Sequence, residues 1–145
     1  MIRFIGIDYG SKRVGLAISD SLGLTARPLE VVARAKAVAR ILEIVAEYGV
    51  ETVVMGLPTG LSGGEGVSAR EARSLAAQLE SPELRVEFMD ERFTSRMAED
   101  VLLESGMKRR DRRDTVDRVA AAIILQGFLD RRARGTSNPG NPGVV

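Results

Sequence analysis

Asp8, Glu91 and Asp117 are acidic residues whose settings favour one shared metal site. Asp8 ends an apolar, strand-like run, and Glu91 follows another such run at residues 84–89. Asp117 falls in the first turn of an expected helix that can pack beside both strand ends. Convergent carboxylates without histidine or cysteine favour a hard cation such as Mg²⁺. Carboxylate-bound Mg²⁺ commonly serves phosphodiester hydrolysis.

Each of these acids also has an ordinary structural interpretation. An aspartate such as Asp8 can form a turn, and Asp117 can complement the helix dipole. Asp90 and Glu91 are neighbours in a strand and point to opposite faces, so we expect only one of them at the site. Asp114 shares a helical face with Asp117. We interpret Asp20 as a turn residue, because the end of its strand lies opposite to that of Asp8.

Basic residues accompany the acids. Lys12 and Arg13 follow Asp8, and Arg92 follows Glu91, so all three are candidates for phosphate contacts. Residues 108–134 contain nine basic and four acidic residues, a net charge of +5. Most of these basic residues are arginines, which suit bidentate phosphate contacts. The alternative interpretation of the segment is a solvated helix face. The candidates for phosphate contacts at the start of residues 108–134 are Lys108, Arg109, Arg110, Arg112 and Arg113.

The elements that must position these residues follow from hydrophobic periodicity and from glycine and proline positions. We expect strands at residues 2–8, 14–20, 25–32, 52–55 and 84–89. We expect helices at residues 33–49, 67–79, 94–106 and 114–132, with a basic linker at 108–113. Residues 58–66 read as a glycine-rich loop that lacks the Lys-Ser/Thr of a P-loop.

This order predicts an α/β fold with one mixed, five-stranded sheet and helices on both faces. The first three strands form an antiparallel meander and the later strands are parallel. Asp8 and Glu91 then occupy carboxyl ends of strands, where sites form in open sheets. Residues 1–134 form one domain, and we expect the Pro/Gly-rich residues 135–145 to be disordered.

The composition supports this class. A chain of 145 residues with 44% apolar residues fits one globular domain. It has no apolar run long enough for a membrane span, no signal peptide pattern and no cysteine. We therefore expect a cytoplasmic protein without membrane partners.

Four segments together resemble the YqgF/RuvX family. They are residues 6–17 (GIDYGSKRVGLA), 54–58 (VMGLP), 90–95 (DERFTS) and 117–126 (DRVAAAIILQ). The resemblance implies a ribonuclease H-like fold and an acidic triad of Asp8, Glu91 and Asp117. Asp114 is outside the family's core pattern but is similar to the paired helix acids of RuvC-type resolvases, which makes it a candidate fourth ligand.

The resemblance also implies a metal-dependent nuclease that uses two Mg²⁺ or Mn²⁺ ions. Its members are described as Holliday junction resolvases and as nucleases that mature the 5′ end of pre-16S rRNA. The sequence does not choose between branched DNA and precursor rRNA, or between monomer and homodimer. Tyr9 and Phe93 could stack on a base, but core packing is the safer assignment. The competing functions are an ATP-binding module of the actin-like superfamily and a non-catalytic nucleic-acid or ribosome-assembly factor.

Overall fold

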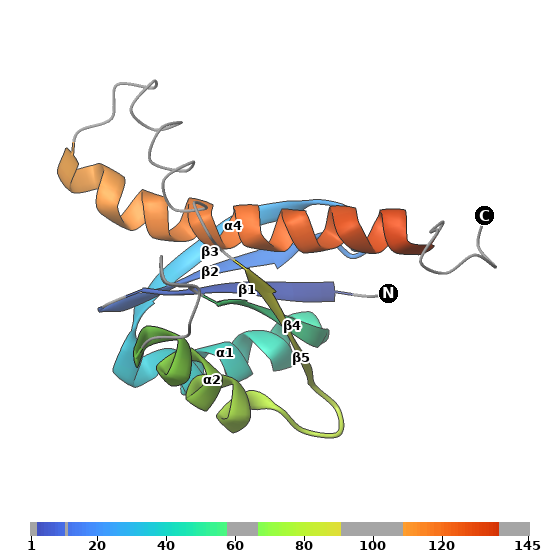
Figure 1. Cartoon of the computed structure of the whole chain (residues 1–145), viewed down its shortest axis with the longest axis horizontal. Coiled ribbons are helices and arrows are strands. Elements are labelled where there is room, and N and C mark those ends of the chain that lie inside the picture. The colour runs from blue at the N-terminus through green and yellow to red at the C-terminus, as the bar shows by residue number, and fades with distance from the viewer. Residues whose placement is uncertain (1–2, 11, 58–66, 91–108, 137–145) are drawn as a thin grey trace.

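The computed structural model describes residues 3–10, 12–57, 67–90 and 109–136. The chain folds into one sheet between two layers of helices, with α4 on one face and α1 and α2 on the other (Figure 1). The elements are β1 (Arg3–Tyr9), β2 (Arg13–Ser19), β3 (Ala26–Ala33), the 3-10 helix η1 (Arg34–Lys36), α1 (Ala37–Tyr48), β4 (Val50–Leu57), α2 (Val67–Leu79), β5 (Arg85–Asp90) and α4 (Arg109–Thr136).

The sheet has the strand order β3-β2-β1-β4-β5. β1, β2 and β3 pair in antiparallel fashion, whereas β4 pairs in parallel with β1 and with β5. The predicted meander and the predicted mixed sheet are therefore confirmed. Because β1, β4 and β5 are parallel, their carboxyl ends lie at one edge of the sheet.

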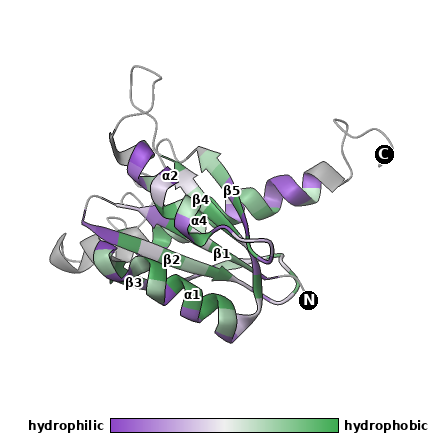
Figure 2. Cartoon of the chain, turned by 90° about the horizontal axis from the view of Figure 1, so that it is seen from below, coloured by the Kyte–Doolittle hydropathy of each residue, from purple (hydrophilic) through white to green (hydrophobic). Residues whose placement is uncertain are grey.

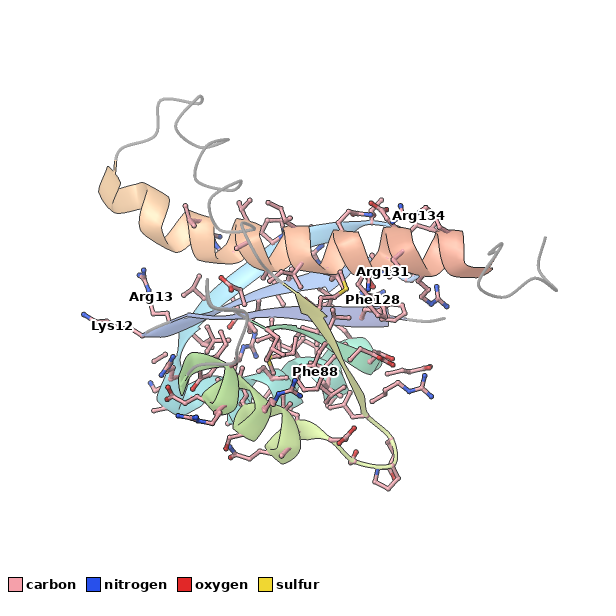
Figure 3. The ribbon with its side chains drawn as sticks, viewed as in Figure 1. Lys12, Arg13, Phe88, Phe128, Arg131 and Arg134 are labelled. Carbon is pink, nitrogen blue, oxygen red and sulfur yellow. The ribbon has the colours of Figure 1, made fainter. Side chains whose placement is uncertain are left out.

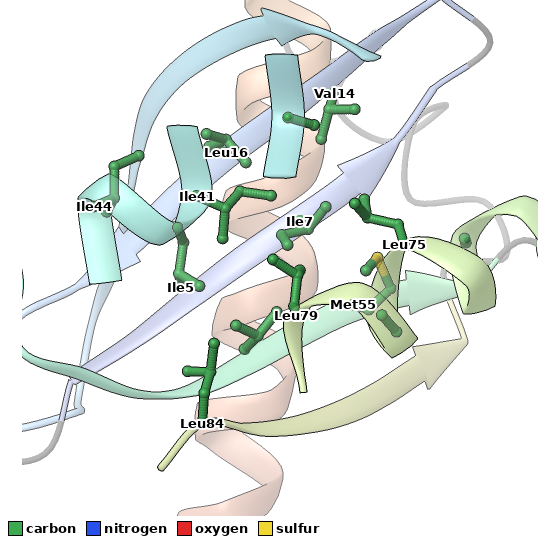
Figure 4. Close-up of a cluster of buried hydrophobic side chains, with 14 of the residues drawn as sticks. Ile5, Ile7, Val14, Leu16, Ile41, Ile44, Met55, Leu75, Leu79 and Leu84 are labelled. Atoms are coloured by element: carbon green, nitrogen blue, oxygen red, sulfur yellow. The ribbon is translucent and has the colours of Figure 1, made fainter. Parts of the chain in front are cut away.

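Alternate residues of the strands supply two separate cores. The core beneath α1 and α2 is the larger one and includes Ile5, Ile7, Leu16 and Met55 (Figure 4). The core beneath α4 joins residues of β1, β2 and β4 to the helix. Its buried members are Phe4, Ala17, Val54, Ala121, Ile124, Leu125 and Leu129. Both faces of the central strands are covered, which explains their continuous apolar runs and the hydrophobic colouring of the sheet in Figure 2.

α1 ends where the sequence predicts. Gly49 adopts a left-handed conformation with φ of 67°, and its N–H donates to the carbonyl of Val45. Glycine accepts this conformation without steric cost, so it caps the helix efficiently.

The predicted basic linker is wrong for residues 109–113. α4 begins at Arg109, so residue 114, the expected start of the last helix, lies inside it. Arginine is a good helix former, and residues 109–126 contain no glycine or proline to interrupt the helix. α4 also continues through Gly135 and Thr136, into the segment expected as a disordered tail. Lys108, the helix expected at 94–106, the loop at 58–66 and residues 137–145 lie outside the described residues.

α4 runs antiparallel to β1 and touches it closely. Phe4 packs against Phe128, with ring centroids 5.6 Å apart. Further along the strand, a Cβ added to Gly6 would lie 2.7 Å from Leu125 Cβ and 2.8 Å from the carbonyl oxygen of Ala121. Real Cβ atoms are not found so close to other atoms, so the packing of α4 depends on glycine at position 6.

We expect Gly6→Val to destabilise the protein by about 1–3 kcal/mol, because the added atoms push α4 away from the sheet. Gly127→Ala is the matched control within the same interface, since its Cβ would meet only the flexible Met89 Cε at 3.6 Å. The control should be neutral or slightly stabilising, because alanine is the better helix former. Urea unfolding measures both, and equal stabilities for the two variants would contradict this packing.

Candidate active site

Asp8 lies on the face of β1 that α4 covers. It is two residues after Gly6, so both residues point to the same side of the sheet. Its side chain is only 4% exposed. Burial of a carboxylate is costly unless hydrogen bonds or a cation compensate it. Asp8 is therefore a buried acid at the carboxyl end of a central strand, the position at which sites form in open sheets.

Asp8 is flanked by glycine on both neighbouring strands. Its register partners are Gly15 on β2 and Gly56 on β4. Residues paired in this way share a face of the sheet, so neither neighbouring strand places a side chain beside the carboxylate. The sequence analysis did not assign a role to these glycines, although glycine inside a strand often marks a close approach by a ligand or another backbone.

Asp117 lies beyond the Gly6 contact on α4, as Asp8 does on β1. The Ala121 carbonyl lies beside Gly6. Asp117 is one helical turn before Ala121, a rise of about 6 Å along the helix. Asp8 is two residues beyond Gly6 in the opposite chain direction, a rise of about 6.6 Å along the strand. Asp117 and Asp8 therefore lie on the same side of this contact along the two elements, with Asp114 nearly one turn further toward the start of the helix.

Met89 and Asp90 occupy successive positions of β5, which belong to opposite faces of the sheet. Met89 is in register with Gly56, whereas Asp90 is in register with Leu57. Met89 packs into the core beneath α4, and Leu57 belongs to the opposite core. Asp90 therefore has the strand position of the face away from Asp8. Glu91 and Arg92 lie outside the described residues, as does Phe93.

The predicted triad remains a prediction. Within the described ranges, no three Asp, Glu, His or Cys side chains form a group able to hold a metal ion. Of the three expected ligands, the structure describes the side chain of Asp8 and the backbone of Asp117.

The turn after Asp8 presents the first candidate phosphate contacts. Lys12 is exposed and Arg13 is half-buried. Both lie at the end of the sheet where β1 finishes (Figure 3). The turn is closed by a hydrogen bond from the Gly10 N–H to the carbonyl of Arg13, 2.9 Å long. A Cβ at Gly10 would lie 2.7 Å from that same carbonyl oxygen, so this tight turn requires glycine.

Tyr9 packs against the core beneath α1 and α2, and the guanidinium of Arg34 lies 4.1 Å from the centre of its ring. Core packing, which was the safer assignment for Tyr9, is confirmed. Arg34 is a residue near the site that the sequence analysis missed. It also donates hydrogen bonds to Gly10 and Glu71. Arg34 and Glu71 are 37 residues apart in the sequence, and no local pattern indicates their contact.

The arginines of the predicted linker belong to the first turns of α4. These first turns lie at the same end of the molecule as the β1–β2 turn (Figure 1). Positive charge near a helix N-terminus opposes the helix dipole. The helix dipole therefore does not explain these arginines, although their helix propensity favours the helical conformation.

A cavity of about 410 Å³ lies elsewhere. Thr52, Arg85, Phe128 and Arg132 contribute to its lining, so it opens at the amino ends of β4 and β5. Since Asp8 is at the carboxyl ends of the parallel strands, this cavity does not mark the candidate active site.

Asp20 is a turn residue, as predicted. Its Oδ1 accepts hydrogen bonds from the N–H groups of Leu24 at 2.7 Å and Thr25 at 3.2 Å. The hydrogen bond from Leu24 is the main reason that the pKa of Asp20 lies below its ordinary value. Asp20 thus holds the β2–β3 turn and is separate from Asp8.

No helix in the described part of the chain is long and apolar enough to cross a membrane.

Comparisons with known proteins give a consistent result. The model of a family described as "RuvX: Holliday junction resolvase" matches residues 2–131. A protein of Pelotomaculum thermopropionicum named "Putative pre-16S rRNA nuclease" is 42% identical, over 97% of this chain and 98% of its own. A protein of Moorella thermoacetica with the same name is 45% identical, over 90% of this chain and 96% of its own.

Among solved structures, the fowlpox virus resolvase in complex with Holliday junction DNA superposes with a TM-score of 0.55. The alignment covers 90% of this chain and 98% of the viral chain at 12% sequence identity. At this identity the likeness concerns the fold alone, and it confirms the expected ribonuclease H-like architecture.

We expect Asp20→Asn to remove part of the pH dependence of stability. Because folding lowers the pKa of Asp20, its carboxylate stabilises the protein above the pKa of the unfolded chain. This stabilisation is lost as the pH falls through the folded-state pKa. Thermal unfolding between pH 2 and 7 should show wild type and variant converging in acid, and a constant difference would contradict the assignment.

Proposed function

Because the chain belongs to the RuvX family of Holliday junction resolvases, we propose that it is a divalent-metal-dependent endonuclease acting on structured nucleic acid. Membership of this family makes the protein a nuclease, and the proposal concerns its metal, its site and its substrate. The observation that carries the proposal is Asp8, an acid buried beside two glycines at the carboxyl end of the central strand.

The donor set fits a hard divalent cation. Asp8, Glu91 and Asp117 offer only carboxylate oxygens, with Asp114 as a candidate fourth ligand, and the chain contains no histidine or cysteine. Such ligands suit Mg²⁺ or Mn²⁺. Two bound ions would supply activation of the attacking water and stabilisation of the leaving oxygen.

The surroundings of Asp8 support this assignment. The charge of a bound cation offsets the cost of burying a carboxylate. Gly15 and Gly56, the register partners of Asp8, place no side chain beside it on the neighbouring strands. Asp117 on α4 would offer a second carboxylate from a different element. Glu91 follows β5, whose carboxyl end lies at the same edge of the sheet.

The basic residues are proposed as phosphate contacts. Lys12 and Arg13 follow Asp8 in the β1–β2 turn, and Arg92 follows Glu91. Lys108 and the four arginines in the first turns of α4 add a second group. Phosphates would compensate the unfavourable position of these cations near the positive end of the helix dipole.

The names of the relatives favour precursor 16S rRNA as the substrate. With this substrate the protein would act in the cytoplasm. The family description favours a four-way DNA junction. Both are branched or folded nucleic acids that a basic surface can recognise by shape. Paired cuts in a junction would require a homodimer with two-fold symmetry, whereas trimming of rRNA needs only a monomer. An ATP-binding role of the actin-like type is disfavoured, because the family model that matches residues 2–131 is described as a Holliday junction resolvase.

We expect Asp8→Asn to abolish cleavage and to leave nucleic-acid binding largely intact, since the change removes a metal ligand and keeps the basic surface. Cleavage of junction DNA, single-stranded DNA and pre-16S rRNA is followed on gels in Mg²⁺ and in Mn²⁺. Binding is followed by fluorescence anisotropy without metal. Asp20→Asn is the matched control and should cut like wild type. An Asp8→Asn protein that cuts at the wild-type rate would refute the site, and wild-type binding without cleavage in either metal would favour a non-catalytic factor.

Replacing Arg109, Arg110, Arg112 and Arg113 by glutamine should weaken binding and flatten its salt dependence. Each lost phosphate contact reduces the slope of log K against log salt by about 0.9 for duplex DNA. Affinity is measured between 50 and 300 mM KCl. The exposed Arg70 and Arg85, replaced together by glutamine, are the control and should leave the slope unchanged. Equal slopes for wild type and the quadruple variant would remove this segment from the nucleic-acid interface.

A further inference from the structure

Arg34 makes three contacts around the turn that follows Asp8. It is the first residue of η1, between β3 and α1. Its Nε donates to the carbonyl oxygen of Gly10 at 2.8 Å. Its Nη1 donates to Glu71 Oε2 at 3.0 Å, and its guanidinium lies 4.1 Å from the centre of the Tyr9 ring. One side chain thus joins three elements that are distant in sequence.

These contacts restrain the backbone directly after Asp8. The N–H of Gly10 bonds the carbonyl of Arg13, and the carbonyl of Gly10 accepts from Arg34. Both polar backbone groups of Gly10 are therefore engaged. The ring of Tyr9, the residue next to Asp8, is held between the core and the guanidinium. The strand end that carries Asp8 consequently has little freedom to shift.

Stability alone is a weak explanation for this arrangement. The side chains of Arg34 and Glu71 are 25% and 43% exposed. Ion pairs with such exposure contribute little to the free energy of unfolding, because water screens them and ordering two long side chains costs entropy. The arrangement does, however, fix geometry near the candidate site, where small displacements of a ligand have large effects on rate.

We propose that Arg34 is a positioning residue for the nuclease reaction. It holds the Gly10 carbonyl and the Tyr9 ring, and thereby fixes the direction in which Asp8 presents its carboxylate. This inference rests on the proposed function, in which Asp8 binds the metal ion. Arginine is required because its planar guanidinium can stack on a ring and donate two hydrogen bonds in its plane, which a lysine ammonium cannot do.

The test compares Arg34→Ala, Arg34→Lys and Glu71→Gln with wild type and with Arg40→Ala. Arg40 is the matched control, because it is also a partly exposed arginine with two carboxylate partners, Glu30 at 2.8 Å and Glu43 at 3.2 Å. Its contacts lie on α1 and β3, away from the turn. Three quantities are measured: kcat and KM for a cleaved substrate, the Mn²⁺ affinity of the free protein by electron paramagnetic resonance, and thermal unfolding.

For Arg34→Ala we expect kcat to fall and the Mn²⁺ dissociation constant to rise, each by about tenfold, because residues that orient metal ligands have effects of this size. KM should change by less than about threefold, since the basic surface is retained. Arg34→Lys should lose less than Arg34→Ala. Glu71→Gln should have the smallest effect, because the bond to Gly10 and the stacking on Tyr9 remain. Arg40→Ala should match wild type in kcat and Mn²⁺ affinity.

A merely structural role gives a different result. The Arg34 variants would then unfold at lower temperature, while the protein that is still folded would bind Mn²⁺ and cut like wild type. That result would overturn the positioning role and leave the proposed function standing. If Arg34→Ala does not fold, Arg34→Lys and Glu71→Gln decide by the same measurements. If wild type binds Mn²⁺ but cuts none of the substrates, the nuclease proposal fails and the Mn²⁺ affinities still test Arg34. If wild type neither binds Mn²⁺ nor cuts, both proposals fail.

Discussion

The close approach of α4 to β1 is the constraint on which the rest of the structure depends. A hydrogen atom at Gly6 allows the helix to lie where any larger side chain would collide with Leu125 and with the Ala121 carbonyl. This contact sets the height of the helix above the sheet and its register along the strand. We propose that the same register brings Asp117 of α4 toward Asp8, two residues further along β1. In this proposal, the packing of α4 at Gly6 sets the geometry of the candidate site.

The chemistry follows from burial of charge beside this contact. Asp8 is nearly inaccessible, and its neighbours on β2 and β4 are glycines. A carboxylate is retained in such a place only when compensating charge or hydrogen bonds are present. In the proposed function a divalent cation would add such compensation and would supply the reactivity of a nuclease. The Arg34 contacts restrain the turn that follows Asp8.

Much of this could be predicted from the sequence, because it depends on local patterns. The apolar runs ending at Asp8 and at Met89, and the glycine after Tyr48, indicated β1, β5 and the end of α1. The helix expected at residues 33–49 does not by itself say which of its residues are buried. Leu42 is 43% exposed, whereas Ala37 and Ile44 are buried. The start of α4 was wrong, because a run of arginines was interpreted as a linker although arginine favours helices.

The sequence could not indicate the contacts that join distant elements. No local sequence pattern indicates that Arg34 contacts Glu71 or that Gly6 lies against Leu125, because tertiary packing creates both contacts. The central claim is that Asp8 and Asp117 share a metal ion, and anomalous diffraction from crystals grown with Mn²⁺ tests it most directly. The account predicts a manganese peak at bonding distance from oxygen atoms of both carboxylates. Manganese bound elsewhere, or an Asp8 carboxylate bonded only to protein groups under saturating Mn²⁺, would contradict it.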